Sequence, residues 1–113
     1  MVYCTTSSNI ADGMIVTLQE NHGIQDMMNH VELSSGNIYG VAIGTQINEL
    51  VNINTETSGN VLVTTNNGNI QIGDLLGVSV TNPGYAEKYT QGDVLGRASS
   101  SNEEDNIIIS FTN

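Results

Sequence analysis

At 113 residues the chain is long enough for one domain with one hydrophobic core, and no stretch approaches the roughly 20 apolar residues of a membrane-spanning helix. Twelve acidic residues outnumber two basic ones, Lys88 and Arg97, and the formal net charge of −10 argues against nucleic acid or an anionic membrane as a partner. Charged residues make up only 12% of the chain. Asn, Ser and Thr take their place, and because these residues suit turns and strand surfaces better than helix interiors, we expect an all-β protein.

The chain begins with a short segment, residues 1–9, in which Val2 and Cys4 alternate with polar residues before a polar run. This pattern predicts an N-terminal arm or an edge strand. Cys4 is the only cysteine, so it cannot form an internal disulfide, and we expect it to be a small side chain packed on that strand. The segment has neither the basic start nor the apolar run of a signal peptide.

Residues 10–113 are predicted to form a single β domain. Apolar alternation and turn signals every 8–12 residues indicate about eight to ten short strands with little or no helix, as in a small barrel or sandwich. Gly40 and Gly44 mark positions where a bulge or a close backbone approach is expected, which favours a tightly coiled barrel. The strands are expected at residues 14–18, 30–33, 38–44, 47–55, 61–65, 70–72, 75–80, 85–89, 94–98 and 106–111, the last buried on both faces because its apolar run is continuous.

Residues 20–29 lack strand alternation and contain Gly23, which predicts a loop. His22, Asp26 and His30 are spaced four residues apart, and on one helix face they could hold a divalent metal. Gly23 disfavours that helix, and His30 is predicted to open the next strand. We therefore expect solvated histidines and no metal site.

The stretch 66–98 carries three turn signals. An Asn-Gly pair suits a type I′ hairpin because both residues tolerate positive φ, and a Gly-Asp pair repeats the signal between two apolar runs. A Pro-Gly pair suits the central positions of a type II turn. The aspartate of the Gly-Asp pair is the most tempting catalytic carboxylate, but we expect it to cap its own turn by accepting an amide hydrogen bond from two residues on. The predicted turn residues are Asn67, Gly68, Gly73, Asp74, Pro83 and Gly84.

No arrangement of residues predicts catalysis. No serine lies in a Gly-x-Ser-x-Gly elbow or beside a basic group, and the acidic run 103–106 lacks the spacing of a calcium loop. We therefore predict no catalytic, cofactor-binding or metal-binding residue. Tyr85 and Tyr89 flank a three-residue strand segment with their rings on one face. They could pack on the barrel, form an interface or stack on a glycan.

Two short segments are loosely alike, residues 38–42 (IYGVA) and 94–98 (VLGRA), and we expect them to occupy analogous strands. Residues 67–76 (NGNIQIGDLL), 83–88 (PGYAEK) and 94–98, with Ser79 between the first two, resemble a recurrent pattern in C-terminal parts of phage tail-fibre and other appendage proteins. Residues 38–42 are similar to the strand that precedes this pattern. Some of these relatives are peptidase G2-like intramolecular chaperone domains that cleave themselves.

The resemblance implies a β-rich module of a trimeric or otherwise oligomeric phage appendage. We therefore expect a non-enzymatic structural protein at the surface of a virus particle, as a capsid decoration or tail-appendage module. It is expected to form a homo-oligomer, a trimer rather than another state, and to dock to other virion proteins without nucleic acid, membrane or cofactor. Two alternatives are an autoproteolytic, intramolecular-chaperone module of a phage fibre and a glycan-binding surface module.

Overall fold

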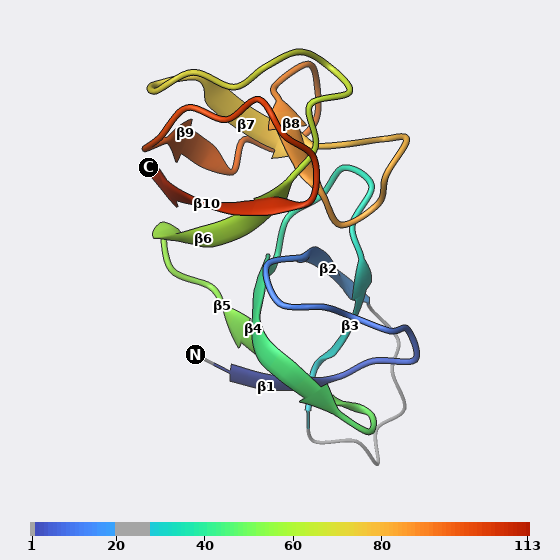
Figure 1. Ribbon diagram of the computed structural model, residues 1–113. Coiled ribbons are helices and arrows are strands. Elements are labelled where there is room, and N and C mark those ends of the chain that lie inside the picture. Colours follow the sequence, from blue (N-terminus) through green and yellow to red (C-terminus); the bar gives the residue numbers. More distant parts are fainter. Residues whose placement is uncertain (1, 20–27) are drawn as a thin grey trace.

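The computed structural model of the chain describes residues 2–19 and 28–113, which form ten β-strands in two closed barrels (Figure 1). The prediction of an all-β fold built from short strands is confirmed. The described residues form no helix, so they include none that is long and apolar enough to cross a membrane.

The first barrel has the strand order β1–β3–β2–β4–β5 and closes through pairing of β1 with β5. Its strands are β1 (Val2–Thr5), β2 (Ile15–Gln19), β3 (His30–Leu33), β4 (Gly40–Ile47) and β5 (Leu50–Asn54). The second barrel has the order β10–β6–β8–β7–β9 and closes through β9 and β10. Its strands are β6 (Ser58–Val63), β7 (Leu75–Val78), β8 (Ala86–Lys88), β9 (Gly96–Ala98) and β10 (Ile107–Thr112).

The two barrels have the same topology. In each, the first strand runs parallel to the third and antiparallel to the fifth. The second strand pairs antiparallel with the third and the fourth, and the fourth pairs with the fifth. The two similar segments noted in the sequence, 38–42 and 94–98, lie at the start of the equivalent strands β4 and β9. The chain is therefore an internal repeat of one five-stranded barrel.

A glycine occupies the same place in both repeats and shows why the barrels can be so narrow. A Cβ atom on Gly40 would lie 2.5 Å from the carbonyl oxygen of Asn54, and one on Gly96 would lie 2.8 Å from that of Thr112. In each repeat the fourth strand approaches the fifth so closely that a side chain does not fit. The close approach expected at Gly40 is confirmed, and the register between β4 and β5 shifts between Ile43 and Ile47, around Gly44.

Two cores lie inside the fold, and the second joins the barrels into one domain. Buried side chains of the first barrel, among them Val16 and Ile53, form the smaller cluster. The larger cluster fills the second barrel, but it also includes Ile15 and Val41 from the first. Since both barrels contribute to this cluster, we expect them to unfold together.

Three local expectations were wrong. Ile107 and Ile108 of β10 are exposed, because Ile107 lies at the first position of the strand and Ile108 faces away from the barrel interior, which Ile109 and Phe111 fill. Only Gly68 of the Asn-Gly pair has positive φ, so this turn is not type I′. Residues 70–72 form no strand, and Ile70 makes only an isolated bridge to Asn102, because β8 and β10 already occupy both sides of β6.

Candidate interaction surfaces

The contact between the two barrels is formed by the outer face of β2 and β4. Ile15 and Val41 lie opposite each other on this face, and their side chains are 0% and 1% exposed. The amide of Ile15 donates a hydrogen bond to the carbonyl of Gly84 at 2.7 Å. The amide of Leu62 in β6 donates to the carbonyl of Gly13 at 2.8 Å. We call this contact the internal junction.

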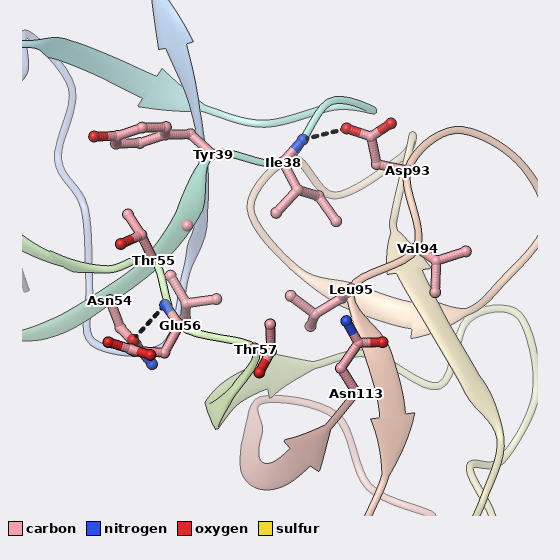
Figure 2. Close-up of a pocket in the computed structure, with 12 residues that line it drawn as sticks. Ile38, Tyr39, Asn54, Thr55, Glu56, Thr57, Asp93, Val94, Leu95 and Asn113 are labelled. Atoms are coloured by element: carbon pink, nitrogen blue, oxygen red, sulfur yellow. Dashed lines mark hydrogen bonds between the residues drawn. The ribbon is translucent and has the colours of Figure 1, made fainter.

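A groove of about 330 Å³ runs along one side of the internal junction (Figure 2). Ile38 and Leu95 line it together with polar residues that include Thr57 and Asn113. The carboxylate of Asp93 accepts a hydrogen bond from the amide of Ile38 at 2.9 Å, which ties a loop of the second barrel to the first. This hydrogen bond therefore contributes to holding the barrels in one orientation.

The second barrel has an uncovered surface at the positions that form the internal junction in the first. Leu75 lies opposite Arg97 there, at the positions that Ile15 and Val41 take in the first barrel. A shallow pocket of about 310 Å³ opens on this surface, and Arg97 donates to the carbonyl of Gly73 at 2.9 Å. We call this surface the β7/β9 face. It is lined by Gly73, Asp74, Leu75, Lys88, Tyr89 and Arg97.

The charge of the β7/β9 face is unusual for this molecule. Lys88 and Arg97 are the only two basic side chains in the sequence, and both line the same pocket. The sequence did not reveal this grouping, because it depends on the order β8–β7–β9, which places residues from two strands on either side of Leu75. In a chain with net charge −10, this face is where a negatively charged group of a partner would be most favoured.

At the opposite end of the molecule lie β1, β5 and β4 (Figure 1), and their outer face carries an exposed apolar patch. Asn52 lies between Tyr3 and Ile43, and Leu50 lies between Thr5 and Ile47. Tyr3 is 63% exposed and Ile47 is 69% exposed. Exposed apolar side chains that gather in this way typically mark an interaction site. We call this surface, comprising Tyr3, Ile43, Ile47 and Leu50, the β1/β5 face.

A polar cluster fixes the segment that follows β1. Glu32 accepts hydrogen bonds from the amide and hydroxyl of Ser7, at 3.0 and 2.6 Å, and from the hydroxyl of Ser8. The ring of His30 lies between Glu32, at 2.5 Å, and the hydroxyl of Thr5, at 2.9 Å. His30 is the first residue of β3, as predicted, but it is buried rather than solvated. His22 and Asp26, the other members of the suggested metal pattern, lie outside the described residues.

The same cluster changes the pKa of Glu32. Burial alone would raise it, but the hydrogen bonds from Ser7, Ser8 and His30 outweigh burial and lower the pKa from 4.5 to about 2. Because the pKa in the folded protein lies below the unfolded value, the ionised carboxylate stabilises the fold above about pH 4.5. This stabilisation is lost as the pH falls from there toward 2.

We therefore expect Glu32→Gln to lower the free energy of unfolding at pH 7 by an amount on the order of 2 kcal/mol. The difference from the wild type should shrink steadily between pH 5 and pH 2, as measured by urea unfolding followed by circular dichroism. Glu103→Gln removes an exposed carboxylate and serves as the control, with an unchanged pH profile. A constant difference for Glu32→Gln at every pH would contradict the role of its charge.

The residues singled out in the sequence lie at several separate places. The carboxylate of Asp74 accepts from the amide of Gln71 at 2.9 Å, three residues before it rather than two after it. Tyr85 lines a polar pocket of about 260 Å³ and donates to Asn106 at 2.6 Å, whereas Tyr89 lines the β7/β9 face. The two rings therefore do not share one pocket, and glycan stacking by them stays a prediction.

The turn at Pro83 and Gly84 takes part in the internal junction, a role that the sequence did not indicate. Gly84 has φ of 90°, and the carbonyl of Asn82 accepts from Tyr85, as a type II turn with Pro83 requires. The amide of Gly84 also donates to the carbonyl of Ser34 in the first barrel at 2.8 Å.

Cys4 lies in the core of the first barrel, where burial raises the pKa of its thiol. Across residues 2–19 and 28–113, no three acidic, histidine or cysteine side chains are grouped as metal ligands.

Neither a protein-family model nor a curated protein matches the sequence. The fold is similar to a solved structure, the crystal structure of the head fiber gp8.5 N base in bacteriophage phi29. The TM-score is 0.71 at 14% sequence identity, and the match covers 98% of this chain and 90% of the other. The chain thus shares its fold with this head fiber base.

Proposed function

We propose that the protein is a non-enzymatic structural protein of a bacteriophage particle, which acts at the virion surface by docking to other virion proteins and by self-association. The observation that carries this proposal is the fold shared with a phage head fiber base over 98% of the chain. The sequence pattern that resembles phage appendage modules supports it independently of the fold. Membership of the peptidase G2-like group rests on that pattern alone, and the proposal does not require it.

The two uncovered faces support self-association. The β1/β5 face exposes large apolar side chains, and the β7/β9 face combines Leu75 and Tyr89 with the two cations. Both are surfaces that a soluble protein usually covers with a partner. We propose a homotrimer, in which the six barrels of three chains would form one closed assembly.

The mass of the protein in solution tests self-association. Native mass spectrometry and sedimentation velocity at tens of micromolar protein should give three times the chain mass of 12.0 kDa. A monomer throughout this range would contradict the proposed self-association.

Docking to the particle needs a separate measurement. Antibodies against the protein, visualised by immunogold electron microscopy, should label the outside of intact phage particles whose genome encodes this chain. Particles that remain unlabelled, while the same antibodies detect the free protein, would contradict the virion role.

A further inference from the structure

We propose that copies of this chain associate head to tail, with the β1/β5 face of one copy on the β7/β9 face of the next. The inference rests on the self-association proposed above and names the surfaces that mediate it. It follows from the internal repeat, because the junction inside the chain shows which face of one barrel receives which face of another.

The register identifies the equivalent positions. Phe111 lies opposite Ala98 in the second barrel, as Ile53 lies opposite Ala42 in the first. Counting back along the fifth strand from this pair places Ile108 at the position of Leu50. The partners of these two residues across the first strand, Leu62 and Thr5, are equivalent in the same way.

The internal junction joins two different faces. A Cβ atom on Gly13 would lie 3.3 Å from the Cβ of Leu62 and 3.4 Å from the Cδ1 of Ile108. The turn before β2 in the first barrel therefore packs on the β6/β10 side of the second, while Ile15 and Val41 of β2 and β4 pack against the core of the second barrel. In the first barrel, β1 and β5 are equivalent to β6 and β10. In the second barrel, β7 and β9 are equivalent to β2 and β4. These two surfaces lie at opposite ends of the molecule (Figure 1). These two free surfaces are the β1/β5 face and the β7/β9 face. They are equivalent to the two surfaces that meet in the internal junction, so one can receive the other in the same way.

The side chains of the two faces suit a contact between copies. Leu75 is 37% exposed and Leu50 is 39% exposed, so each face offers an aliphatic centre. Lys88 and Arg97 line the same pocket as Leu75, where they outnumber the single acidic residue Asp74, and the exposed Glu49 directly precedes Leu50. Opposite charges beside apolar centres favour this orientation over the pairing of two identical ends. Because every copy carries net charge −10, contacts that exclude the two cations would bring acidic surfaces together.

The contact between copies differs from the internal junction in one respect. The backbone hydrogen bond from Leu62 to Gly13 has no free counterpart at the ends of the chain. The carbonyl of Gly73 already accepts from Arg97, and the amide of Thr5 already donates to the carbonyl of Asn29 at 2.9 Å. Side chains therefore carry the contact, and it should be reversible, unlike the permanent junction between the barrels.

A contact between two different faces leaves one face of each kind free at the ends of an open assembly. It therefore closes only as a ring or continues as a filament. The proposed trimer would be the closed form, with the internal junction and the contact between copies alternating around it.

Cysteine cross-linking tests the pairing of the faces. Leu50→Cys and Leu75→Cys are made in separate chains, mixed in equal amounts and treated with a short bismaleimide. We expect a covalent dimer from the mixture and little from either variant alone. Leu50→Cys mixed with Val80→Cys is the control, since Val80 is 53% exposed but belongs to neither face. Wild-type protein, whose single Cys4 is buried, should not react.

Two results would overturn the pairing. They are efficient cross-linking of Leu50→Cys to itself, and an oligomer of normal mass in which the Leu50–Leu75 pair reacts no better than the control pair. In both cases self-association stands and only the head-to-tail surfaces are wrong. A monomeric mass would instead remove the self-association on which the inference rests.

Charged substitutions on the two faces test the pairing independently of cross-linking. Leu50→Lys and Leu75→Asp should each raise the dissociation constant of the oligomer at least tenfold, because each places its charge against like charges of the facing copy, whereas Val80→Asp should leave it unchanged. Thermal unfolding checks that each variant folds, since all three residues are exposed. Unchanged dissociation constants for folded Leu50→Lys and Leu75→Asp would also contradict the pairing.

Discussion

Gly40→Ala is expected to lower the free energy of unfolding by about 3 kcal/mol, one of the two largest losses from a single substitution in this protein. The added methyl group would lie 2.5 Å from both the carbonyl oxygen of Asn54 and the Cγ2 atom of Ile53. The carbonyl oxygen belongs to the backbone of β5, so it can move away only if the barrel opens. Urea unfolding at neutral pH, followed by circular dichroism, measures the loss as a lower transition midpoint.

Gly36→Ala is the matched control for this substitution. No atom lies within 4 Å of a Cβ at Gly36, and its φ is not positive, so its stability should stay within about 0.5 kcal/mol of the wild type. If Gly40→Ala were as stable as Gly36→Ala, the close approach of β4 and β5 would not be a constraint on the barrel.

Ile15→Ala is expected to cost about 3 kcal/mol, whereas Leu75→Ala should change stability by less than about 1 kcal/mol. The two residues are equivalent in the repeated barrels, but Ile15 is fully buried in the core shared with the second barrel and Leu75 is exposed. The same measurement applies to both, so the comparison isolates the contribution of the internal junction.

The shape of the Ile15→Ala unfolding curve carries a second piece of information. If the barrels share one core, fluorescence and circular dichroism should report a single coincident transition for the wild type and for the variant. Equal stabilities of Ile15→Ala and Leu75→Ala, or two separate transitions in the wild type, would contradict the shared core.

The sequence predicted the strands well because alternation and turn residues are local signals. Expected strands such as 30–33 and 94–98 lie within a few residues of β3 and β9. It did not predict which strands pair, and some turns were therefore assigned to the wrong type. The Asn-Gly pair looked like a hairpin because nothing local shows that β6 already has two neighbours.

The internal repeat was almost hidden because its two copies have different surroundings. Gly40 and Gly96 are retained in both barrels, since both lie against the fifth strand. The outward positions differ, because Val41 is covered by the second barrel whereas Arg97, its equivalent, faces solvent. The segments 38–42 and 94–98 kept enough similarity to suggest equivalent strands.

The interaction surfaces could be predicted only in part, because they depend on which strands pair. The low positive charge was evident from composition, but the gathering of Lys88 and Arg97 in one pocket required the strand order of the second barrel. Tyr85 and Tyr89 were both named as candidates for an interface or for glycan stacking, and of the two Tyr89 lines that pocket. The β1/β5 face was missed, because it forms only when β1, which carries Tyr3, pairs with the distant strand β5.

The most direct test is a cryo-electron microscopy map of the phage particle whose genome encodes this chain. The proposal is supported if density for the two-barrel fold lies on the outside of the particle, with the β1/β5 face of one copy against the β7/β9 face of the next. A map of complete particles that lacks this density would contradict the structural role in the virion.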